Sequence, residues 1–366
     1  MKFSLLVAPS RIENGSRLNE FDVAKGIGIL FVIFFHIHKT GIACDIVYSF
    51  HMPLFFFISG FLFRKDKYSS FSQFFKKRMQ SLFCPYFLFI FVSFAAWTLV
   101  QKFYWRNGIS GFFDEDTFAF FKEIFIVRQS DKIPFNPPLW FVPCLLLVEF
   151  IYYFLSKIKK APFLFAIVAL LAGTGWYLES DYCFFDSSFL PWNLPSALFA
   201  LSFYFTGNKL FPYLKKFLDK SKPYIFALVF VLVAIIDIPL ALHNGHVTLG
   251  SRELSNGFIF YITGIAGTLG IISLSKLIQK CRLLKWLGKN SLYMMSTHIP
   301  FLSAYSILES MVKKGTGEAP YNYENVLECL LPFIITVIVC SVFTFVYIKI
   351  KDYILTQKIA CKLKQI

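Results

Sequence analysis

Apolar residues along this chain are gathered into long runs that are separated by shorter polar segments. Most of the runs are 16–22 residues long, close to the roughly 20 residues that an α-helix needs to cross the hydrocarbon core of a bilayer. The sequence shows no internal repeat and no separate soluble domain. The pattern predicts an all-α, polytopic membrane protein with ten transmembrane helices, over residues 23–38, 48–63, 80–100, 138–155, 161–178, 190–207, 223–242, 258–275, 290–308 and 327–348.

The composition agrees with a membrane protein. Hydrophobic residues make up 56% of the chain, aromatic residues 20% and charged residues 16%, and the mean hydropathy is +0.59. Soluble globular domains carry about 25% charged residues, so a surface made from this sequence would be too apolar to stay dissolved. We therefore expect a multi-pass protein of the cell (inner, or plasma) membrane that contacts membrane lipids.

Basic residues are distributed unevenly along the chain. Of the 37 Lys and Arg residues, 28 lie in alternate polar segments, namely 1–25, 64–79, 156–160, 208–222, 276–289 and 349–366. Cytoplasmic loops of membrane proteins are enriched in Lys and Arg, so both termini are predicted to be cytoplasmic. Topology then explains the net charge of +15, and no nucleic-acid partner is expected.

This topology divides the chain into a cytoplasmic N-terminal segment (1–20), a membrane domain (21–349) and a basic cytoplasmic tail (350–366). The longest connection, residues 101–137, becomes external, and its stretch FAFFKEIFIV predicts an amphipathic segment along the membrane interface. Cys44 and Cys183 also fall in external loops, where they form either a disulfide or, as we favour, free thiols.

The first predicted span, DVAKGIGILFVIFFHIH, carries polar residues at both ends. Lys25 and His36 are 11 residues apart, about three helical turns, so they share one face at a separation of roughly 16 Å. Asp22 lies one turn before Lys25 on the same side. In the predicted topology the lysine is at the cytoplasmic edge of the membrane and the histidine lies towards the outer surface.

Two interpretations of this face remain open. Lys25 is typical of a positive-inside residue that reaches the inner headgroups, and His36 and His38 are then interfacial histidines with satisfied hydrogen bonds. Alternatively, ionisable groups in a membrane segment mark a functional site, in which His36 is the reacting group. Gly26 and Gly28 thin the inner half of the helix and allow close approach by a neighbouring helix or a ligand.

The second and third predicted spans meet at the densest basic segment of the chain. Arg78 stands directly before the apolar run of the third span, where a guanidinium suits a phosphate or a carboxylate. Topology and anionic lipids account for its basic neighbours. Ser59 and Gly60 form a small pair at which helices can pack tightly, and Pro85 is expected to loosen the third helix.

Two residues of the fourth span have different expected roles. Trp140, at its outer start, is interpreted as an anchor in the interfacial aromatic belt. Glu149 lies deeper, and because an unpaired carboxylate in lipid is costly, it is expected to have a partner in the helix bundle.

Five motifs together resemble the integral-membrane acyltransferases of acyltransferase family 3. They are RLNEFDVAKGIGILFVIFFH, FHMPLFFFISGFLF, FFKKRMQSLFCPYF, PLWFVPCLL and LGKNSLYMMSTHIPF, and in the family's order and spacing they span nearly the whole chain. Members of the family acylate, and usually O-acetylate, surface carbohydrates. The sequence lacks the soluble hydrolase-like domain that some relatives append, so the membrane part is expected to act alone or with a partner.

The resemblance implies roles for residues in these motifs. His36 matches the family's essential histidine. Lys25 matches a cation three turns earlier that is Arg in many members; the lysine binds as a point charge, without the bidentate geometry of arginine. Arg78 matches the arginine before the P-Y pair. The late G-K-N-S-L…H motif, expected to be structural or pocket-lining, contributes Asn290, Ser291 and His298.

The resemblance also implies the substrates. Acetyl-CoA or another acyl-CoA is the co-substrate, bound at the cytoplasmic rim by Lys25 and Arg78, with its acyl arm passing the helix-one glycines. The acceptor is a hydroxyl of a surface polysaccharide, a lipopolysaccharide or a lipid-linked glycan. Neutral His36 takes the hydroxyl proton or carries the acyl group itself. No permanently bound cofactor is expected. Further candidate pocket residues are Asp22, His51, Ser59 and Glu149.

Other polar residues in the outer half are weaker candidates. His298 is either a helix–helix hydrogen-bonding residue, which we favour, or a second pocket residue. His243 and His246 have a spacing that can hold a metal, but no Cys or acidic ligands cluster with them, so no metal site is expected and a solvated loop is favoured. Asp237 is expected to pair locally or to help bind a sugar.

A transporter or flippase of glycans or lipid-linked sugars is the alternative function. Ten spans and one polar helix face suit it as well. Transporters often contain repeated halves with paired broken helices, and the sequence shows no such symmetry.

Overall fold

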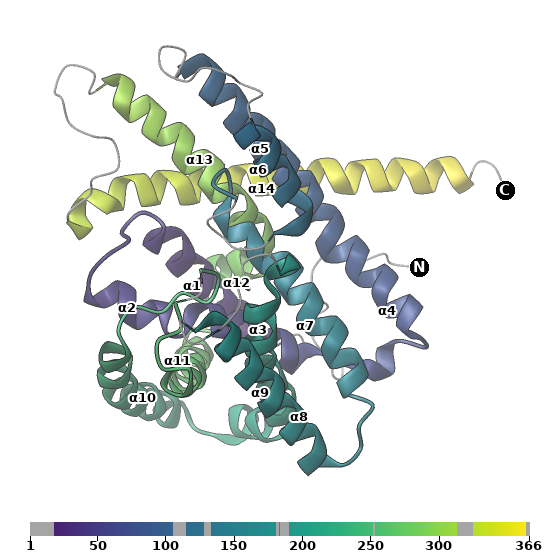
Figure 1. Ribbon diagram of the computed structural model, residues 1–366, viewed down its shortest axis with the longest axis vertical. Coiled ribbons are helices and arrows are strands. Elements are labelled where there is room, and N and C mark those ends of the chain that lie inside the picture. Colours follow the sequence, from purple (N-terminus) through teal and green to yellow (C-terminus); the bar gives the residue numbers. More distant parts are fainter. Residues whose placement is uncertain are drawn as a thin grey trace.

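The computed structural model describes residues 18–104, 115–127, 133–180, 183, 190–251, 253–312 and 325–363 (Figure 1). Most of the predicted N-terminal segment and the last three residues of the predicted tail lie outside the described residues. Within the described ranges there are helices and loops but no strand, and Thr248 and Glu253 form an isolated bridge. The α-helices are α1 (Asn19–Phe35), α2 (Ile42–Tyr48), α3 (His51–Leu62), α4 (Phe71–Arg78), α5 (Cys84–Tyr104), α6 (Glu115–Ile126), α7 (Phe141–Leu155), α8 (Ala161–Glu179), α9 (Leu194–Lys220), α10 (Pro223–Asn244), α11 (Gly257–Leu277), α12 (Arg282–Lys289), α13 (Ser291–Val312) and α14 (Val326–Leu363).

Each of the ten predicted spans contains a helix. Seven helical stretches of the described chain are long and apolar enough to cross a membrane: Ile42–Leu62, Phe71–Thr98, Pro137–Leu155, Ala161–Glu179, Pro223–Asn244, Gly257–Leu277 and Val326–Ile354. This confirms an all-α protein with several membrane-spanning helices. The total of ten and the cytoplasmic position of the termini remain predictions, because the helices of the other three spans, α1, α9 and α13, are shorter or more polar.

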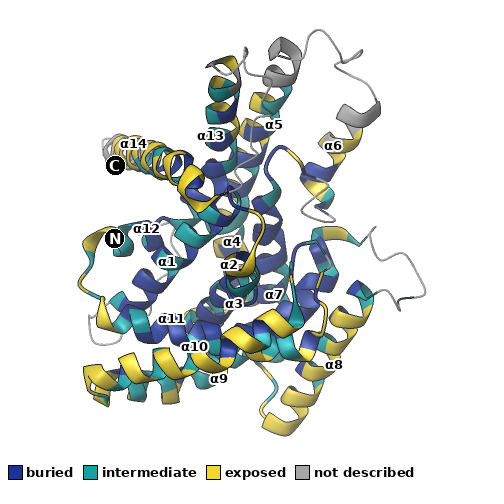
Figure 2. Cartoon of the chain, turned by 90° about the vertical axis from the view of Figure 1, so that its left-hand side faces the viewer, coloured by how far each residue is buried: buried dark blue, intermediate teal, exposed yellow. Residues whose placement is uncertain are grey.

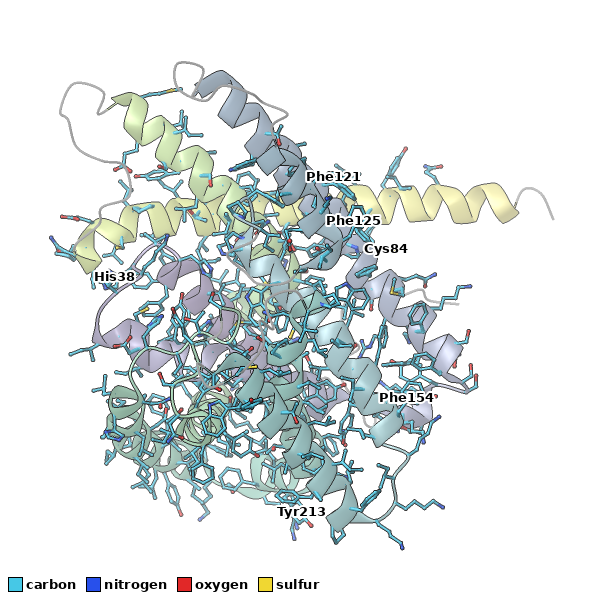
Figure 3. All side chains as sticks on the ribbon, in the orientation of Figure 1. His38, Cys84, Phe121, Phe125, Phe154 and Tyr213 are labelled. Carbon is cyan, nitrogen blue, oxygen red and sulfur yellow. The ribbon has the colours of Figure 1, made fainter. Side chains whose placement is uncertain are left out.

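The apolar helices differ in how far they are buried by the rest of the protein. The share of the most apolar stretch that is buried inside the protein is 72% for α7 with the turn before it. The same share is 17% for α10 and 22% for α8. Figure 2 shows rows of exposed residues along α8, α10 and α14, and Phe121, Phe125, Phe154 and Tyr213 project from the surface in Figure 3. Such a surface is unfavourable in water and matches a lipid environment.

Helices α3 and α9 pack with their backbones in contact. A Cβ added at Gly60 would lie 1.9 Å from the carbonyl oxygen of Tyr204, and one added at Gly207 would lie 2.1 Å from that of Phe57. Small residues permit this approach between membrane helices. The prediction of tight packing at Gly60 is therefore confirmed.

Helices α1 and α12 pack in the same way at the other side of the core. A Cβ at Gly26 would lie 2.1 Å from the carbonyl oxygen of Leu284, and one at Gly288 would lie 1.7 Å from that of Asp22. Gly28 faces the side chain of Leu54 in α3. The expected close approach of neighbouring helices at the helix-one glycines is therefore confirmed, and the acyl path past them stays a prediction.

The third predicted span begins with an irregular turn. Residues Met79–Phe83 form a π-helical turn between α4 and α5, directly before Pro85. Proline has no N–H to donate to the preceding turn, and π-turns inside α-helices occur frequently at functional sites. The expected loosening of the backbone is thus confirmed one turn before the proline.

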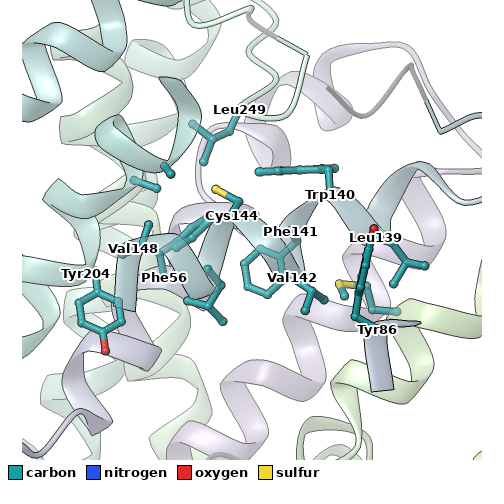
Figure 4. Close-up of a cluster of buried hydrophobic side chains, with 14 of the residues drawn as sticks. Phe56, Tyr86, Leu139, Trp140, Phe141, Val142, Cys144, Val148, Tyr204 and Leu249 are labelled. Atoms are coloured by element: carbon teal, nitrogen blue, oxygen red, sulfur yellow. The ribbon is translucent and has the colours of Figure 1, made fainter. Parts of the chain in front are cut away.

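Trp140 does not face lipid. Its side chain is 6% exposed, and a Cβ at Gly250 would lie 2.4 Å from the indole ring. Figure 4 shows the ring beside Leu249, above Cys144 and Phe141 of α7. The prediction of an interfacial anchor is wrong, because the loop between α10 and α11 folds over this end of α7 and covers the ring.

Two other segments that the topology predicts to be external fit the sequence analysis in part. FAFFKEIFIV lies mostly in α6, which buries Ile124 and exposes Phe121 and Phe125; its position at the membrane interface remains a prediction. Cys44 and Cys183 are free thiols, as favoured. At the other end of the chain, α14 continues through residue 349 to Leu363 without a break.

Candidate active site

A cavity of about 250 Å³ runs along one face of α1. This helix contributes Lys25, Ile29, Val32 and His36, which follow the spacing of one helical face. The other walls come from α2 and α3, the π-helical turn, the start of α7, the α10–α11 loop and the α12–α13 junction. Polar and aromatic side chains on these walls include Tyr48, His51, Phe55, Ser59, Ser81, Trp140, Thr248, Ser251, Lys289, Ser291 and Tyr293.

The cavity connects the two ends of α1. Lys25 borders it near the start of the helix, and His36 borders it just after the last helical residue. The spacing of 11 residues therefore predicted correctly that both side chains share a face. The structure adds that this face is directed into the protein and opens into one continuous space.

His36 is oriented by its own helix. Its Nδ1 lies 2.6 Å from the carbonyl oxygen of Val32. A carbonyl oxygen only accepts hydrogen bonds, so Nδ1 carries the hydrogen in the neutral ring and Nε2 keeps its lone pair. An imidazole in this tautomer can accept a proton at Nε2.

His298 contacts His36 directly. The two ring centroids are 5.0 Å apart, with an angle of 78° between the ring planes. Nδ1 of His298 donates to the carbonyl oxygen of Met295 at 2.8 Å, and within the described chain its buried Nε2 has no hydrogen-bond partner. The favoured helix–helix hydrogen bond of this histidine is therefore not what the structure shows; the ring is a neighbour of His36 instead.

His51 is the third histidine at this end of the cavity. Its Nδ1 donates to the carbonyl oxygen of Val47 at 3.0 Å, and its ring lies 4.7 Å from that of Tyr48, centroid to centroid. Both side chains line the cavity. The structure thus brings His51 into the candidate site beside His36.

The opposite end of the cavity is cationic. Lys25 and Lys289 both line it. Nζ of Lys25 is 3.1 Å from a carboxylate oxygen of Asp22, which is 2% exposed. Asp22 therefore lies behind Lys25 and holds its ammonium in place, and it does not line the cavity. Lys276 and Glu20 form a further ion pair close by, at 3.4 Å.

Arg78 and Glu149 form a buried ion pair at 2.8 Å. This supplies the partner that Glu149 was expected to have. The pair borders a second, very small pocket of about 10 Å³, which Ser59 shares with the main cavity. Arg78 therefore lies beside the main cavity and not on its wall, and its charge is already balanced by a carboxylate.

Basic side chains surround this second pocket. Arg64 and Lys67 line it together with Tyr68, and Arg64 is paired with Asp66 at 2.7 Å. Burial raises the pKa of the Tyr68 phenol, so the side chain is a neutral hydrogen-bond donor at physiological pH. The pocket is therefore lined by three basic side chains and one carboxylate, Glu149.

Asn290 and Ser291 have separate positions in the turn between α12 and α13. The amide of Asn290 donates to the carbonyl oxygen of Trp286 at 2.9 Å and so fixes the turn. Ser291 lines the cavity. The late motif is thus partly structural and partly pocket-lining.

The outer polar residues also divide into two groups. Nδ1 of His246 is 2.9 Å from a carboxylate oxygen of Asp45, so this histidine is paired and not only solvated. In the described ranges no three His, Cys, Asp or Glu side chains lie close enough to share a metal ion.

Asp237 is buried in α10 away from the cavity, and in the described part of the chain its Oδ1 has no partner. The expected local pairing or sugar contact of Asp237 is not seen.

Sequence reasoning missed several residues of the cavity wall. Lys289 stands directly before the ninth predicted span, as Arg78 does before the third, and this parallel was a usable signal. The sequence predicts Trp140 as an anchor at the membrane interface and not as part of the cavity wall. Thr248 and Ser251 lie in a loop with no periodic pattern, so the sequence gives no sign that they return to the site.

This arrangement can bind an anionic group at the lysine end and remove a proton at the histidine end. The family model described as an acyltransferase domain, that of acyltransferase family 3, matches residues 18–346. No curated protein and no solved structure matches the chain.

Proposed function

The chain belongs to acyltransferase family 3, and we propose that it acts in the cell membrane as an O-acyltransferase on carbohydrates. The donor is an acyl-CoA, in the simplest case acetyl-CoA, which binds from the cytoplasm and is consumed as a co-substrate. The acceptor is a hydroxyl group of a surface polysaccharide, a lipopolysaccharide or a lipid-linked glycan.

The observation that carries this proposal is the continuous cavity that both Lys25 and His36 line. An acyl transfer across a membrane protein needs an anion site for the donor and a base near the acceptor. The two ends of the cavity carry these groups about three helical turns apart. A donor held at one end can therefore extend its acyl group towards the base at the other.

The lysine end suits the phosphates of the donor. Lys25 and Lys289 provide two ammonium groups, and ammonium groups bind phosphate as point charges without bidentate geometry. Arg64 and Lys67 add positive charge at the neighbouring pocket. Arg78 supports this side through its ion pair with Glu149, so its role is to position the pocket.

His36 acts as the base in direct transfer. Its Nε2 accepts the proton of the acceptor hydroxyl while the hydroxyl oxygen bonds to the thioester carbonyl carbon. The carbon–sulfur bond then breaks, and the CoA thiolate leaves and takes up a proton. In the second route, Nε2 itself bonds to the carbonyl carbon, the carbon–sulfur bond breaks and the CoA thiolate leaves. The acceptor oxygen then bonds to the same carbon, the carbon–nitrogen bond breaks, and Nε2 takes up the hydroxyl proton. A labelled acyl-histidine that accumulates without acceptor would identify the second route.

The proposal is tested by transfer of label from radioactive acetyl-CoA to surface glycan by the purified protein in lipid vesicles. His36→Ala is expected to lower the rate about 10²–10⁴-fold, the contribution typical of a general base. His243→Ala is the matched control, because this exposed histidine ends α10 outside the cavity, and it should retain the wild-type rate.

Two results would contradict the proposal. The first is equal transfer by wild-type protein and His36→Ala at equal protein concentration. The second is movement of unmodified glycan across the vesicle membrane without any donor, which a transporter would show.

A further inference from the structure

The loop between α10 and α11 forms one wall of the cavity at the histidine end. Thr248 and Ser251 line the cavity there, together with the intervening Leu249 and Gly250. They share this end with Tyr48 and His51 of the α2–α3 region. The loop is external in the predicted topology, so it meets a substrate that arrives from outside.

The first part of this loop is fixed by a hydrogen bond to α2. His246 bonds Asp45 of α2 through Nδ1 at 2.9 Å, and its Nε2 lies 3.2 Å from Oγ1 of Thr248. The His246 ring also lies 4.9 Å from that of Tyr48, centroid to centroid. Asp45, His246 and Thr248 thus form a chain of contacts that orients the Thr248 hydroxyl at the cavity.

The second part of the loop is fixed by the start of α9. Asn193 donates from its amide to the carbonyl oxygen of Gly250 at 3.1 Å, and the Ser196 hydroxyl donates to that of Leu249. Gly250 packs on the Trp140 ring, where a Cβ would lie 2.4 Å away. The loop is therefore a fixed wall with a defined shape, which is what selective binding requires.

The two ends of the cavity present different chemistry. Among the described residues that line it, the Lys and Arg side chains are Lys25 and Lys289, at the far end from the loop. The loop end offers the hydroxyls of Thr248 and Ser251 beside aromatic rings. Hydroxyl groups both donate and accept hydrogen bonds, and aromatic rings with polar edges suit ligands that are apolar on one face and polar at the rim. This combination fits a neutral, polyhydroxylated ligand.

We infer that Thr248 and Ser251 bind the carbohydrate acceptor and determine which hydroxyl is presented to His36. The Asp45–His246 pair positions Thr248. The inference rests on the proposed function for the identity of the reaction. A site that hydrogen-bonds a substrate hydroxyl discriminates strongly against analogues that lack it.

Kinetics with labelled acetyl-CoA and a panel of methyl glycosides test this inference. Ser251→Ala and Thr248→Val should each raise the acceptor KM about tenfold, the effect of losing one hydrogen bond. The KM for acetyl-CoA and the slow hydrolysis of acetyl-CoA by water should stay within about twofold. Thr248→Ser, which keeps the hydroxyl, should restore acceptor binding. Ser255→Ala, in the same loop but outside the cavity lining, should behave as wild type.

A labelling experiment tests acceptor binding at the loop without depending on acyl transfer. Ser251→Cys and Ser255→Cys, with Cys44 and Cys183 replaced by Ser, are treated with a membrane-impermeant maleimide in right-side-out vesicles. Methyl glycosides should slow labelling at position 251 and not at position 255.

Unchanged acceptor KM in Ser251→Ala and Thr248→Val, or absence of protection at position 251, would overturn the inference. Protection at position 251 without any transfer of label by wild-type protein would instead overturn the proposed function.

Discussion

The imidazole of His36 is oriented by a backbone carbonyl and not by a carboxylate. His51 and His298 share this arrangement, since each donates from Nδ1 to a carbonyl of the preceding turn. In each ring the lone pair is therefore at Nε2. At the residue scale the site thus gathers imidazoles in one tautomer around one end of the cavity, while Lys25 at the other end is held by its ion pair with Asp22.

The Arg78–Glu149 pair yields a prediction for stability. Glu149→Gln leaves the buried guanidinium without its counter-charge and is expected to destabilise the protein by about 3–5 kcal/mol. The double variant Arg78→Met, Glu149→Leu removes both charges and should recover most of this stability. Thermal unfolding in detergent measures both effects.

Activity of the double variant separates two roles of Arg78. If Arg78 only positions the second pocket, the stable double variant should keep the wild-type KM for acetyl-CoA within about threefold. A rise of about tenfold or more would correspond to at least one lost charged contact and would show that Arg78 binds the donor. Equal destabilisation by the single and double variants would contradict the ion-pair explanation.

Local spacing predicted part of this site from the sequence, and tertiary contacts decide the rest. Lys25 and His36 belong to one helix, and the helical repeat alone fixes their common face. Glu149 was recognised as needing a partner, but its pairing with Arg78 joins helices that are far apart in sequence. The burial of Trp140 depends on a loop more than 100 residues later, which no pattern at the start of α7 reveals.

Helix α1 is held by close contacts on both flanks of the face that lines the cavity. Gly26 lies against α12, and Gly28 lies against α3. These contacts leave the Lys25–His36 face free to line the cavity. At the element scale, the small residues therefore set the position of α1 while the polar residues of the face between them carry the chemistry.

Enlarging Gly26 tests this division. Gly26→Ala places a Cβ 2.1 Å from the carbonyl oxygen of Leu284, which forces α1 and α12 apart and is expected to cost about 1–3 kcal/mol of stability. Gly173→Ala is the matched control, because nothing lies within 4 Å of an added Cβ there and alanine favours a helix over glycine. Thermal unfolding of the two variants in detergent makes the comparison; equal stability would refute close packing at Gly26.

Across the whole molecule, the two ends of the cavity carry different chemistry. Lysines lie at the end that the distribution of basic residues assigns to the cytoplasm, and histidines and hydroxyls lie at the other end. The length of each apolar run sufficed to predict an all-α membrane protein. It did not suffice to establish ten crossings, because α1 has only 17 residues, and α9 and α13 hold polar residues that face the protein interior and lower their hydropathy.

The predicted topology can be checked with two single cysteines placed at opposite ends. Ser255→Cys lies in the α10–α11 loop and Ser72→Cys lies in the basic helix α4, with the exposed native cysteines replaced. In right-side-out vesicles, an impermeant maleimide should label position 255 at once and position 72 only after the membrane is permeabilised. Labelling of both positions in sealed vesicles, or the reverse order, would contradict the orientation.

A structure with a non-hydrolysable acetyl-CoA analogue tests the central claim most directly. The phosphates of the analogue should lie against Lys25 and Lys289, and its acyl carbonyl should lie within about 4 Å of Nε2 of His36, close enough for direct attack or a hydroxyl between them. An analogue bound on another surface, or in the cavity with its acyl group directed away from His36, would contradict the mechanism.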